Sequence, residues 1–461
     1  MRLVNGASEA DWQRLAKAVT GRVLRPGEGG FHAAGTPFNR RFAAAAPSGV
    51  VQVADVEDVR RAILWARETG TALAARGGGH SYAGFSATSG LVVDLSALNS
   101  VHADGSTGLV TAAGGARMAD LNAAIQPHAM AFALGNGDSV GIGGLTLGGG
   151  SAATSRAFGL TADALLATTL VTADGQLLTC DAEQNRDLYW ACRGGGGGNF
   201  GINVSFTFRA TEVSDVSTCL LLWDRADAPR VLPVLQQIML AAPDEFSARI
   251  GVSTAGGAGA LVSAVALHLG PVHELREIIA PALAAARPRR EDLVDRTFWQ
   301  AQEYLRHETS AGAFAVRTNF ATEPLPAQAL AAALALIDTP PPGDNPDGCG
   351  LALFGWGGAI NRVAPQDTAF VHRDARFLLS LDASWAEHDA PATVAANLRW
   401  LADLREALAP YVSQSAYQNF IDPDLPNWRT AYYGANYPRL VEIKKQVDPD
   451  GLFAFPQSIG S

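Results

Sequence analysis

The chain has 461 residues, of which 48% are hydrophobic and 17% are charged, and its formal net charge is −10. This composition is typical of a globular protein with large apolar cores, and the length predicts two domains. The acidic balance argues against a nucleic-acid-binding protein, because binding to phosphates requires a basic surface.

The cysteines and the apolar runs exclude further classes of protein. The four cysteines lie far apart and form no Cys-x-x-Cys pair, which argues against a structural zinc site and a disulfide framework, so we expect no bound metal. No basic cluster followed by an apolar run opens the chain, and no run of about 18 apolar residues occurs. We therefore expect a cytoplasmic protein without a signal peptide or a membrane span.

Short strands and helices alternate over the first 210 residues. Apolar residues at helical spacing predict a helix over residues 56–69, and Gly70 is a typical end signal. Further helices are predicted over residues 9–19, 116–125 and 185–193. Strands are predicted over residues 50–54, 71–76, 90–98, 108–116 and on both sides of a turn within 165–180.

The pattern changes after residue 210. Long helices are predicted over residues 228–242, 272–286 and 391–408, and strands over 259–269 and 375–385. Residues 340–350 are rich in Pro, Gly and Asp, which predicts a surface loop, and the tail is dense in Tyr, Asn and Asp. These changes divide the chain into three predicted segments: residues 1–210, 211–410 and 411–461.

Glycine is concentrated in three segments of the first part: Arg76–His80, Gly141–Gly150 and Gly194–Gly198. Glycine has no Cβ atom, so its backbone N–H groups can approach an anionic ligand closely. None of the segments is a P-loop, and Thr146 breaks the Gly-x-Gly-x-x-Gly pattern of a nicotinamide dinucleotide site. Three such loops indicate one large ligand that is bound along its length.

Four motifs together point to a family. The segments RGGGHSYAGFS, SVGIGGLTLGGG, DLYWACRGGGGGNFGI and YYGANYPRLVEIKKQVDPDGLFAFPQSI occur in this order. They resemble the flavin-linked oxidases similar to berberine bridge enzyme, in the vanillyl-alcohol oxidase and p-cresol methylhydroxylase superfamily. The resemblance covers about residues 40–210 and 345–461. It implies an α+β, two-domain PCMH-type FAD-binding fold, with a substrate domain built on an antiparallel sheet covered by helices.

The resemblance also implies how FAD is held. His80 is the residue linked covalently to the 8α-methyl carbon of the flavin ring. Relatives with a second tether have a cysteine where Gly137 stands here and a proline where Asp138 stands, so we expect FAD to be covalent through His80 only. The FAD-binding residues that the resemblance implies are Arg76, Gly77, Gly78, Gly79, His80, Ser81, Gly84, Gly137, Val140, Gly141, Gly144, Leu145, Thr146, Gly149, Gly198, Phe200, Gly201, Ile202, Tyr433 and Asn436.

Candidate catalytic residues lie in the tail. The segment AYQNF resembles the family's Tyr-x-Asn-Phe/Tyr motif, which makes Tyr417 the candidate base and Asn419 its polar neighbour. A tyrosine with a pKa of about 10 is a poor base at neutral pH, so Tyr417 needs a cation or hydrogen bonds that lower its pKa. Val140 stands at the position that resembles the oxygen gatekeeper, where valine is typical of oxidases.

Several other residues carry weaker expectations. Asn436 is expected to hydrogen-bond the polar edge of the flavin ring. His372 is either a substrate-side acid or base or a structural residue at the entrance of a strand, and we favour the structural role. Lys444 and Lys445 are expected to be solvated. Candidate aromatic walls of the substrate pocket are Trp356, Trp385 and Tyr304.

These features predict an FAD-dependent oxidase. A hydride passes from an alcohol-type or secondary-metabolite substrate to the flavin, and dioxygen then reoxidises the flavin to give hydrogen peroxide. Two alternatives stay open: a flavin dehydrogenase with another electron acceptor, and a flavin-binding homologue without turnover. The expected partners are a small-molecule substrate and dioxygen, and the chain is expected to be a monomer or homodimer. The substrate is not predicted, because residues 211–410 carry little resemblance.

Overall fold

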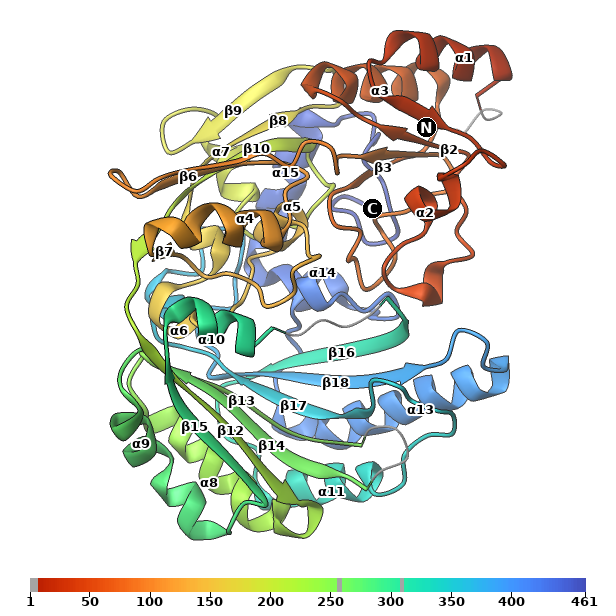
Figure 1. Cartoon of the computed structure of the whole chain (residues 1–461). Coiled ribbons are helices and arrows are strands. Elements are labelled where there is room, and N and C mark those ends of the chain that lie inside the picture. The colour runs from red at the N-terminus through yellow and green to blue at the C-terminus, as the bar shows by residue number, and fades with distance from the viewer. Residues whose placement is uncertain (1–6, 255–258, 307–310) are drawn as a thin grey trace.

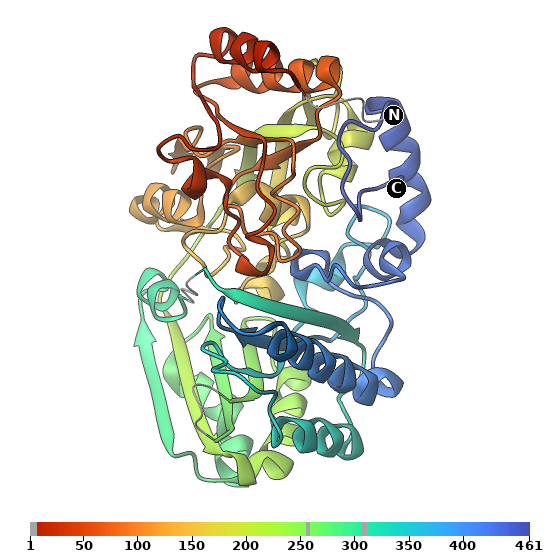
Figure 2. The ribbon, with the colours of Figure 1, turned by 90° about the vertical axis from the view of Figure 1, so that its right-hand side faces the viewer.

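A computed structural model of the chain describes residues 7–254, 259–306 and 311–461. The prediction that the chain has no signal peptide concerns residues 1–6 in part, and these lie outside the described residues. Two regions of sheet and helix face each other across a cavity, and they form the upper and lower parts of Figure 1. Figure 2 shows the C-terminal segment returning along the upper region. No helix within the described ranges is long and apolar enough to cross a membrane.

The upper region contains two small sheets. The first has the order β1-β2-β4-β3, in which β2 and β3 run parallel to β4, and the second, antiparallel, has the order β5-β6-β10-β8-β9. Helix α3 (Val56–Thr69) connects β2 to β3 and ends at Gly70, whose φ of 67° is the left-handed conformation that glycine favours. The strands are β1 (Arg22–Leu24), β2 (Gly49–Gln52), β3 (Leu73–Arg76), β4 (Leu91–Asp94), β5 (Val101–Asp104), β6 (Leu109–Ala113), β8 (Leu165–Val171), β9 (Leu177–Asp181) and β10 (Ile202–Arg209).

A seven-stranded antiparallel sheet forms the lower region, in the order β15-β12-β14-β13-β17-β18-β16. The helices α8 (Ala228–Ala241), α9 (Val272–Ala285), α11 (Ala327–Ile337) and α13 (Pro391–Leu408) cover its far face (Figure 1). Apolar residues on that face join the helices in one buried core, while the other face is turned toward the upper region. The strands are β12 (Val216–Asp224), β13 (Phe246–Thr254), β14 (Leu261–His268), β15 (Arg290–Arg296), β16 (Ala313–Ala321), β17 (Cys349–Gly355) and β18 (Phe377–Trp385).

The C-terminal segment packs back onto the upper region through α14 (Trp428–Tyr433) and α15 (Tyr437–Val447). The prediction that Lys444 is solvated is wrong. Its buried ammonium donates hydrogen bonds to Asp448 (2.6 Å) and to the backbone carbonyls of Asn199 (2.6 Å) and Phe453 (2.7 Å). Because Asn199 follows the third glycine segment, this one side chain anchors the tail to that loop. Lys445 is exposed, as expected.

The predicted α+β class and the antiparallel sheet under helices are confirmed. Most predicted helices and strands lie within a few residues of their expected bounds. The segment boundaries stay a prediction, and β11 (Thr211–Glu212) still pairs with β7 (Met130–Ala131) of the upper region. The remaining helices are α1 (Glu9–Ala18), α2 (Phe31–Gly35), α4 (Met118–Ile125), α5 (Ile142–Leu147), α6 (Ser155–Phe158), α7 (Arg186–Ala191), α10 (Phe298–Tyr304) and α12 (Ala359–Arg362).

Candidate functional site

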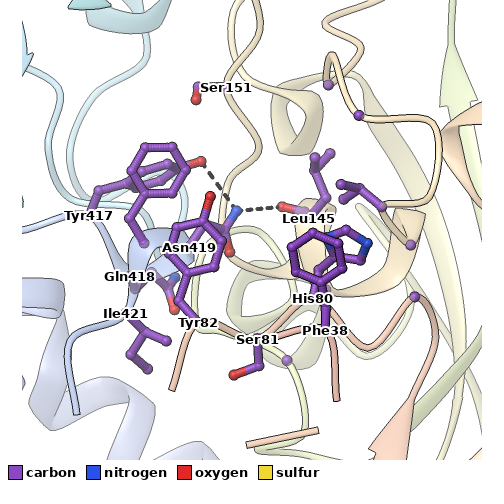
Figure 3. Close-up of a pocket in the computed structure, with 18 of the residues that line it drawn as sticks. Phe38, His80, Ser81, Tyr82, Leu145, Ser151, Tyr417, Gln418, Asn419 and Ile421 are labelled. Carbon is purple, nitrogen blue, oxygen red and sulfur yellow. Dashed lines mark hydrogen bonds between the residues drawn. The ribbon is translucent and has the colours of Figure 1, made fainter. Parts of the chain in front are cut away.

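A cavity of about 940 Å³ lies between the two regions. The three glycine segments line its upper wall, and the free face of the seven-stranded sheet lines its lower wall. Figure 3 shows His80 from the first glycine segment and Tyr417 with Asn419 from the tail converging on this space. Residues 274 positions apart in the sequence, Leu145 and Asn419, are hydrogen-bonded at this site.

The first and second glycine segments touch through their backbones. A Cβ atom on Gly78 would lie 2.3 Å from the backbone nitrogen of Gly141, and one on Gly141 would lie 2.4 Å from the nitrogen of Gly78. At Gly144 the backbone faces the cavity, and a Cβ atom there would meet nothing within 4 Å. The glycines thus have two distinct uses: they bring two loops together, and they keep the cavity wall free of side chains.

Most of the predicted site residues come together at this cavity. Its walls include the predicted FAD-binding residues Gly77, Gly78, Gly79, His80, Ser81, Gly137, Val140, Gly141, Gly144, Leu145, Gly198, Gly201, Ile202 and Tyr433, together with Tyr417 and Asn419. Six others do not line it: Arg76, Gly84, Thr146, Gly149, Phe200 and Asn436.

Arg76 and Asn436 require a correction, because their polar groups are occupied by the protein itself. The Arg76 guanidinium donates to the backbone carbonyls of Ala34–Gly35 and to that of Ser86 (3.0 Å). The Asn436 amide donates to the carbonyls of Pro365, Thr368 and Ala369 at 2.7–3.4 Å. Both side chains therefore hold loops in place, and neither lines the cavity.

The other four residues outside the cavity support its walls from behind. Gly84 adopts φ of 71° and packs against Phe42, and Gly149 adopts φ of 112° and packs against Phe370. Thr146 and Phe200 are buried beneath the loops.

His80 has two neighbours that the sequence analysis did not identify. Its ring stacks on Phe38 with 3.9 Å between centroids (Figure 3), and its Nε2 lies 3.0 Å from the Ser139 hydroxyl. Burial, with a smaller effect of the Arg117 charge, lowers the pKa of His80 to about 4. The imidazole is therefore neutral at pH 7, and with Nε2 engaged by Ser139 its Nδ1 atom is the nitrogen left for another bond.

Tyr417 lies in a network of hydrogen-bond donors. Its hydroxyl oxygen accepts from the backbone N–H of Gly150 (3.1 Å) and from the Asn419 amide (3.2 Å). The same Asn419 amide donates to the Leu145 carbonyl (2.9 Å), which fixes its orientation (Figure 3). These donors lower the pKa of Tyr417, but burial has the larger effect and the net pKa is raised.

We expect Tyr417→Phe to remove the acceptor for Gly150 and Asn419 while leaving both donors buried. Unfolding free energy should fall by ~1–3 kcal/mol, the usual cost of a buried unpaired polar group. Denaturant unfolding measures this effect, and stopped-flow flavin reduction measures any loss of catalysis. A matched control is Tyr411→Phe, which changes a tyrosine outside the cavity. Unchanged stability would show that these hydrogen bonds contribute little.

The lower wall carries the charged groups that the sequence analysis missed. Asp382 on β18 is half-buried and faces the cavity, where it accepts a hydrogen bond from the Ser380 hydroxyl (2.8 Å). Burial raises the pKa of Asp382, and the Ser380 hydrogen bond and the Arg249 charge oppose the rise in part. Arg249 on β13 also lines the cavity, with its guanidinium 5.5 Å from the centre of the Phe354 ring.

Strand alternation explains why these polar residues face the cavity. In β18, Leu379, Leu381 and Ala383 join the core under the helices, so the residues between them point the opposite way. The signal was present in the sequence SLDAS, where polar and apolar residues alternate within a predicted strand. It became interpretable only when the sheet's free face was known to close the cavity.

The remaining candidates divide between the site and its support. His372 is buried, its Nε2 lies 3.1 Å from the Tyr432 carbonyl, and burial lowers its pKa to about 4, which fits the structural role. Trp356 and Tyr304 line the cavity, whereas Trp385 does not. Tyr82, two residues after His80, also lines the cavity, and it packs on Phe420 with 5.2 Å between ring centroids.

The cavity fits a flavin dinucleotide. The backbone of Gly144, Gly197 and Gly198 faces the cavity, and the space where a side chain would stand is open at each of them. A long, extended ligand can therefore approach the backbone N–H groups closely. His80, with a free neutral Nδ1, stands at one end of this wall. Fold and cavity together define a flavoprotein oxidoreductase of the PCMH type.

Comparison with known proteins leads to the family. Two family models match: an FAD-binding domain over residues 47–181, and the berberine and berberine-like model over residues 416–460. An uncharacterized FAD-linked oxidoreductase of Bacillus subtilis (strain 168), YgaK, is 31% identical, with 96% of this chain and 97% of that protein aligned. Reticuline oxidase of Eschscholzia californica is 26% identical, with 90% of this chain and 83% of that protein aligned.

Solved structures agree over the whole chain. Physcomitrella patens BBE-like 1 has a TM-score of 0.88 at 29% identity, and 97% of this chain and 98% of that one are covered. Chitooligosaccharide oxidase has a TM-score of 0.86 at 25% identity, with 98% and 99% covered. The chain belongs to the berberine bridge enzyme-like family of FAD-linked oxidoreductases.

Proposed function

We propose that this protein is an FAD-linked oxidase that takes a hydride and a proton from a small-molecule alcohol or secondary metabolite and reduces dioxygen to hydrogen peroxide. The observation that carries the proposal is one cavity with a glycine-backbone wall opposite a half-buried carboxyl group. Relatives named as a reticuline oxidase and a chitooligosaccharide oxidase support oxidase chemistry, while their substrates differ. When bound, FAD supplies the two-electron acceptor.

The glycine segments would hold the dinucleotide, and His80 would tether it. The neutral imidazole and its free Nδ1 support this role. The four cysteines are all buried and none lines the cavity, which supports a single tether. Gly137, where a second tether would stand, is part of the wall.

The proton of a substrate hydroxyl needs an acceptor whose pKa is close to the working pH. Burial moves the pKa of Asp382 upward from 3.8, toward neutrality, whereas it moves the pKa of Tyr417 upward from 10, away from it. We therefore assign proton acceptance to Asp382. Tyr417 and Asn419 would orient the substrate oxygen through the hydrogen-bond network around the tyrosine hydroxyl.

Dioxygen must reach the reduced ring, and Val140 lines the cavity beside Gly137 and Gly141. We expect Val140→Leu to slow flavin reoxidation by air while leaving reduction by substrate unchanged, because the larger side chain narrows that wall. Val140→Ala is the matched control and should not slow reoxidation. The two half-reactions are measured separately by stopped-flow absorbance. Equal reoxidation rates in all three proteins would remove Val140 from the oxygen path.

The proposed function is tested with the purified holoenzyme and a panel of alcohols and secondary metabolites. Anaerobic bleaching of the flavin identifies a substrate, and admission of air should restore the colour with one peroxide formed per turnover. Reoxidation by a quinone dye but not by air would favour a dehydrogenase. A purified chain without flavin would overturn the proposal.

A further inference from the structure

We propose that the substrate carries an anionic group, most simply a carboxylate, and that Arg249 binds it. This inference rests on the proposed function, because it assigns a substrate class to the same cavity. Arg249 is exposed and lines the cavity, and its guanidinium forms no hydrogen bond or ion pair with any residue that the structure describes. A guanidinium presents five donors in a planar fork that matches a carboxylate.

The position of Arg249 separates it from the dinucleotide wall. Arg249 lies on β13, on the free face of the seven-stranded sheet, whereas the glycine segments form the opposite wall. Phe354, on the neighbouring strand β17, pairs with Arg249 and supports the guanidinium from the side. The sheet thus holds this cation on a rigid element and leaves its donors to a ligand that sits between sheet and loops.

Arg249 is also separated from the proton acceptor. Asp382 on β18 pairs with Gly350 on β17, and Gly350 pairs with Ser253 on β13. Arg249 lies four residues before Ser253, which is about 13 Å along β13. Arg249 and Asp382 form no ion pair, yet the Arg249 charge lowers the pKa of Asp382. A substrate would therefore place its anion at Arg249 and its reacting hydroxyl several bonds away, near Asp382.

The floor between the two charged groups is nearly bare. Gly251, Ala352 and Gly350 occupy facing positions between them and offer no polar side chain, and the hydroxyl of Ser380, which pairs with Ala352, is already donated to Asp382. Apolar residues border this floor: Val265, Leu267, Phe314, Val316 and Phe354. The matching ligand has an apolar or aromatic body with an acidic group at one end.

The test uses benzoate and its neutral isostere benzamide as probes. Both are titrated into the oxidised holoenzyme, and binding is read from the flavin difference spectrum and from calorimetry. We expect benzoate to bind about ten- to a hundredfold more tightly than benzamide, as a charge-assisted bidentate contact requires. Arg249→Gln should abolish this preference and leave benzamide binding unchanged, and Arg249→Lys should retain part of it.

Arg306→Gln is the matched control, because Arg306 lines the same cavity but is already paired with Asp138 at 3.2 Å. It should keep the preference for benzoate. The proposal is overturned if the two probes bind equally to the unmodified protein, or if Arg249→Gln retains the preference. Calorimetry needs no flavin turnover, so this result is separate from the fate of the proposed oxidase activity.

Discussion

Asp382→Asn is expected to slow flavin reduction by about 10²- to 10⁴-fold, the usual contribution of a positioned general base. The amide keeps the shape of the carboxyl group and its place beside Ser380, but it cannot accept a proton. Stopped-flow reduction under anaerobic conditions measures the loss. The substrate Kd should change much less than the rate, because the substitution removes proton acceptance and leaves the cavity walls intact.

The pH dependence of the unmodified protein gives a second measure of Asp382. A base works only in its deprotonated form, so reduction should rise with pH through the pKa of Asp382, which burial holds above 3.8. Arg249→Gln should move this rise to higher pH, because the Arg249 charge lowers that pKa. A rise in the unmodified protein that persists in Asp382→Asn would assign the proton to another group.

The same carboxyl group provides a control for misfolding. Burial raises the pKa of Asp382 in the folded state, so ionisation of this carboxyl group destabilises the fold. The free energy of unfolding therefore falls as the pH rises above the pKa that Asp382 has in the unfolded chain. Asp382→Asn should therefore be at least as stable as the unmodified protein at pH 7, as judged by Tm. A slow variant with a lowered Tm would show that Asp382 acts by supporting the fold and not by accepting a proton.

His80→Ala is expected to abolish covalent attachment of FAD completely. No other described histidine or cysteine lines the cavity, so no second residue can replace the bond. Acid precipitation should leave the flavin with the unmodified protein and release it from the variant, and intact mass should fall by one flavin dinucleotide. The glycine walls remain, so noncovalent FAD binding should persist in the variant.

Two variants make the His80 experiment specific. His102→Ala changes an exposed histidine and should keep the full covalent load. Ser139→Ala removes the hydroxyl 3.0 Å from Nε2 and should leave the tether but slow its formation, because the ring loses the contact that fixes it. Flavin that stays bound to His80→Ala through acid precipitation would place the tether elsewhere.

The sequence by itself was enough for the class of protein. The glycine segments alone indicated one large anionic ligand, and the resemblance of the motifs around His80, Tyr417 and Tyr433 to the berberine bridge enzyme-like oxidases predicted that this ligand is a flavin. The glycine segments carry that first signal because a close backbone approach to a large anionic ligand tolerates few other residues. Local patterns likewise predicted most helices and strands, because a helix cap such as Gly70 or the alternation of polar and apolar residues in β18 involves only a few neighbouring residues.

Only the tertiary structure decided which residues reach the cavity. Arg76 and Asn436 lie in the right motifs but bind backbone carbonyls, and Lys444 anchors the tail to Asn199 instead of facing water. Asp382 and Arg249 lie outside the family motifs, on strands that are neighbours only through β17. Their roles depend on which face of the sheet closes the cavity, and that is set by long-range strand pairing, which no short stretch of sequence encodes.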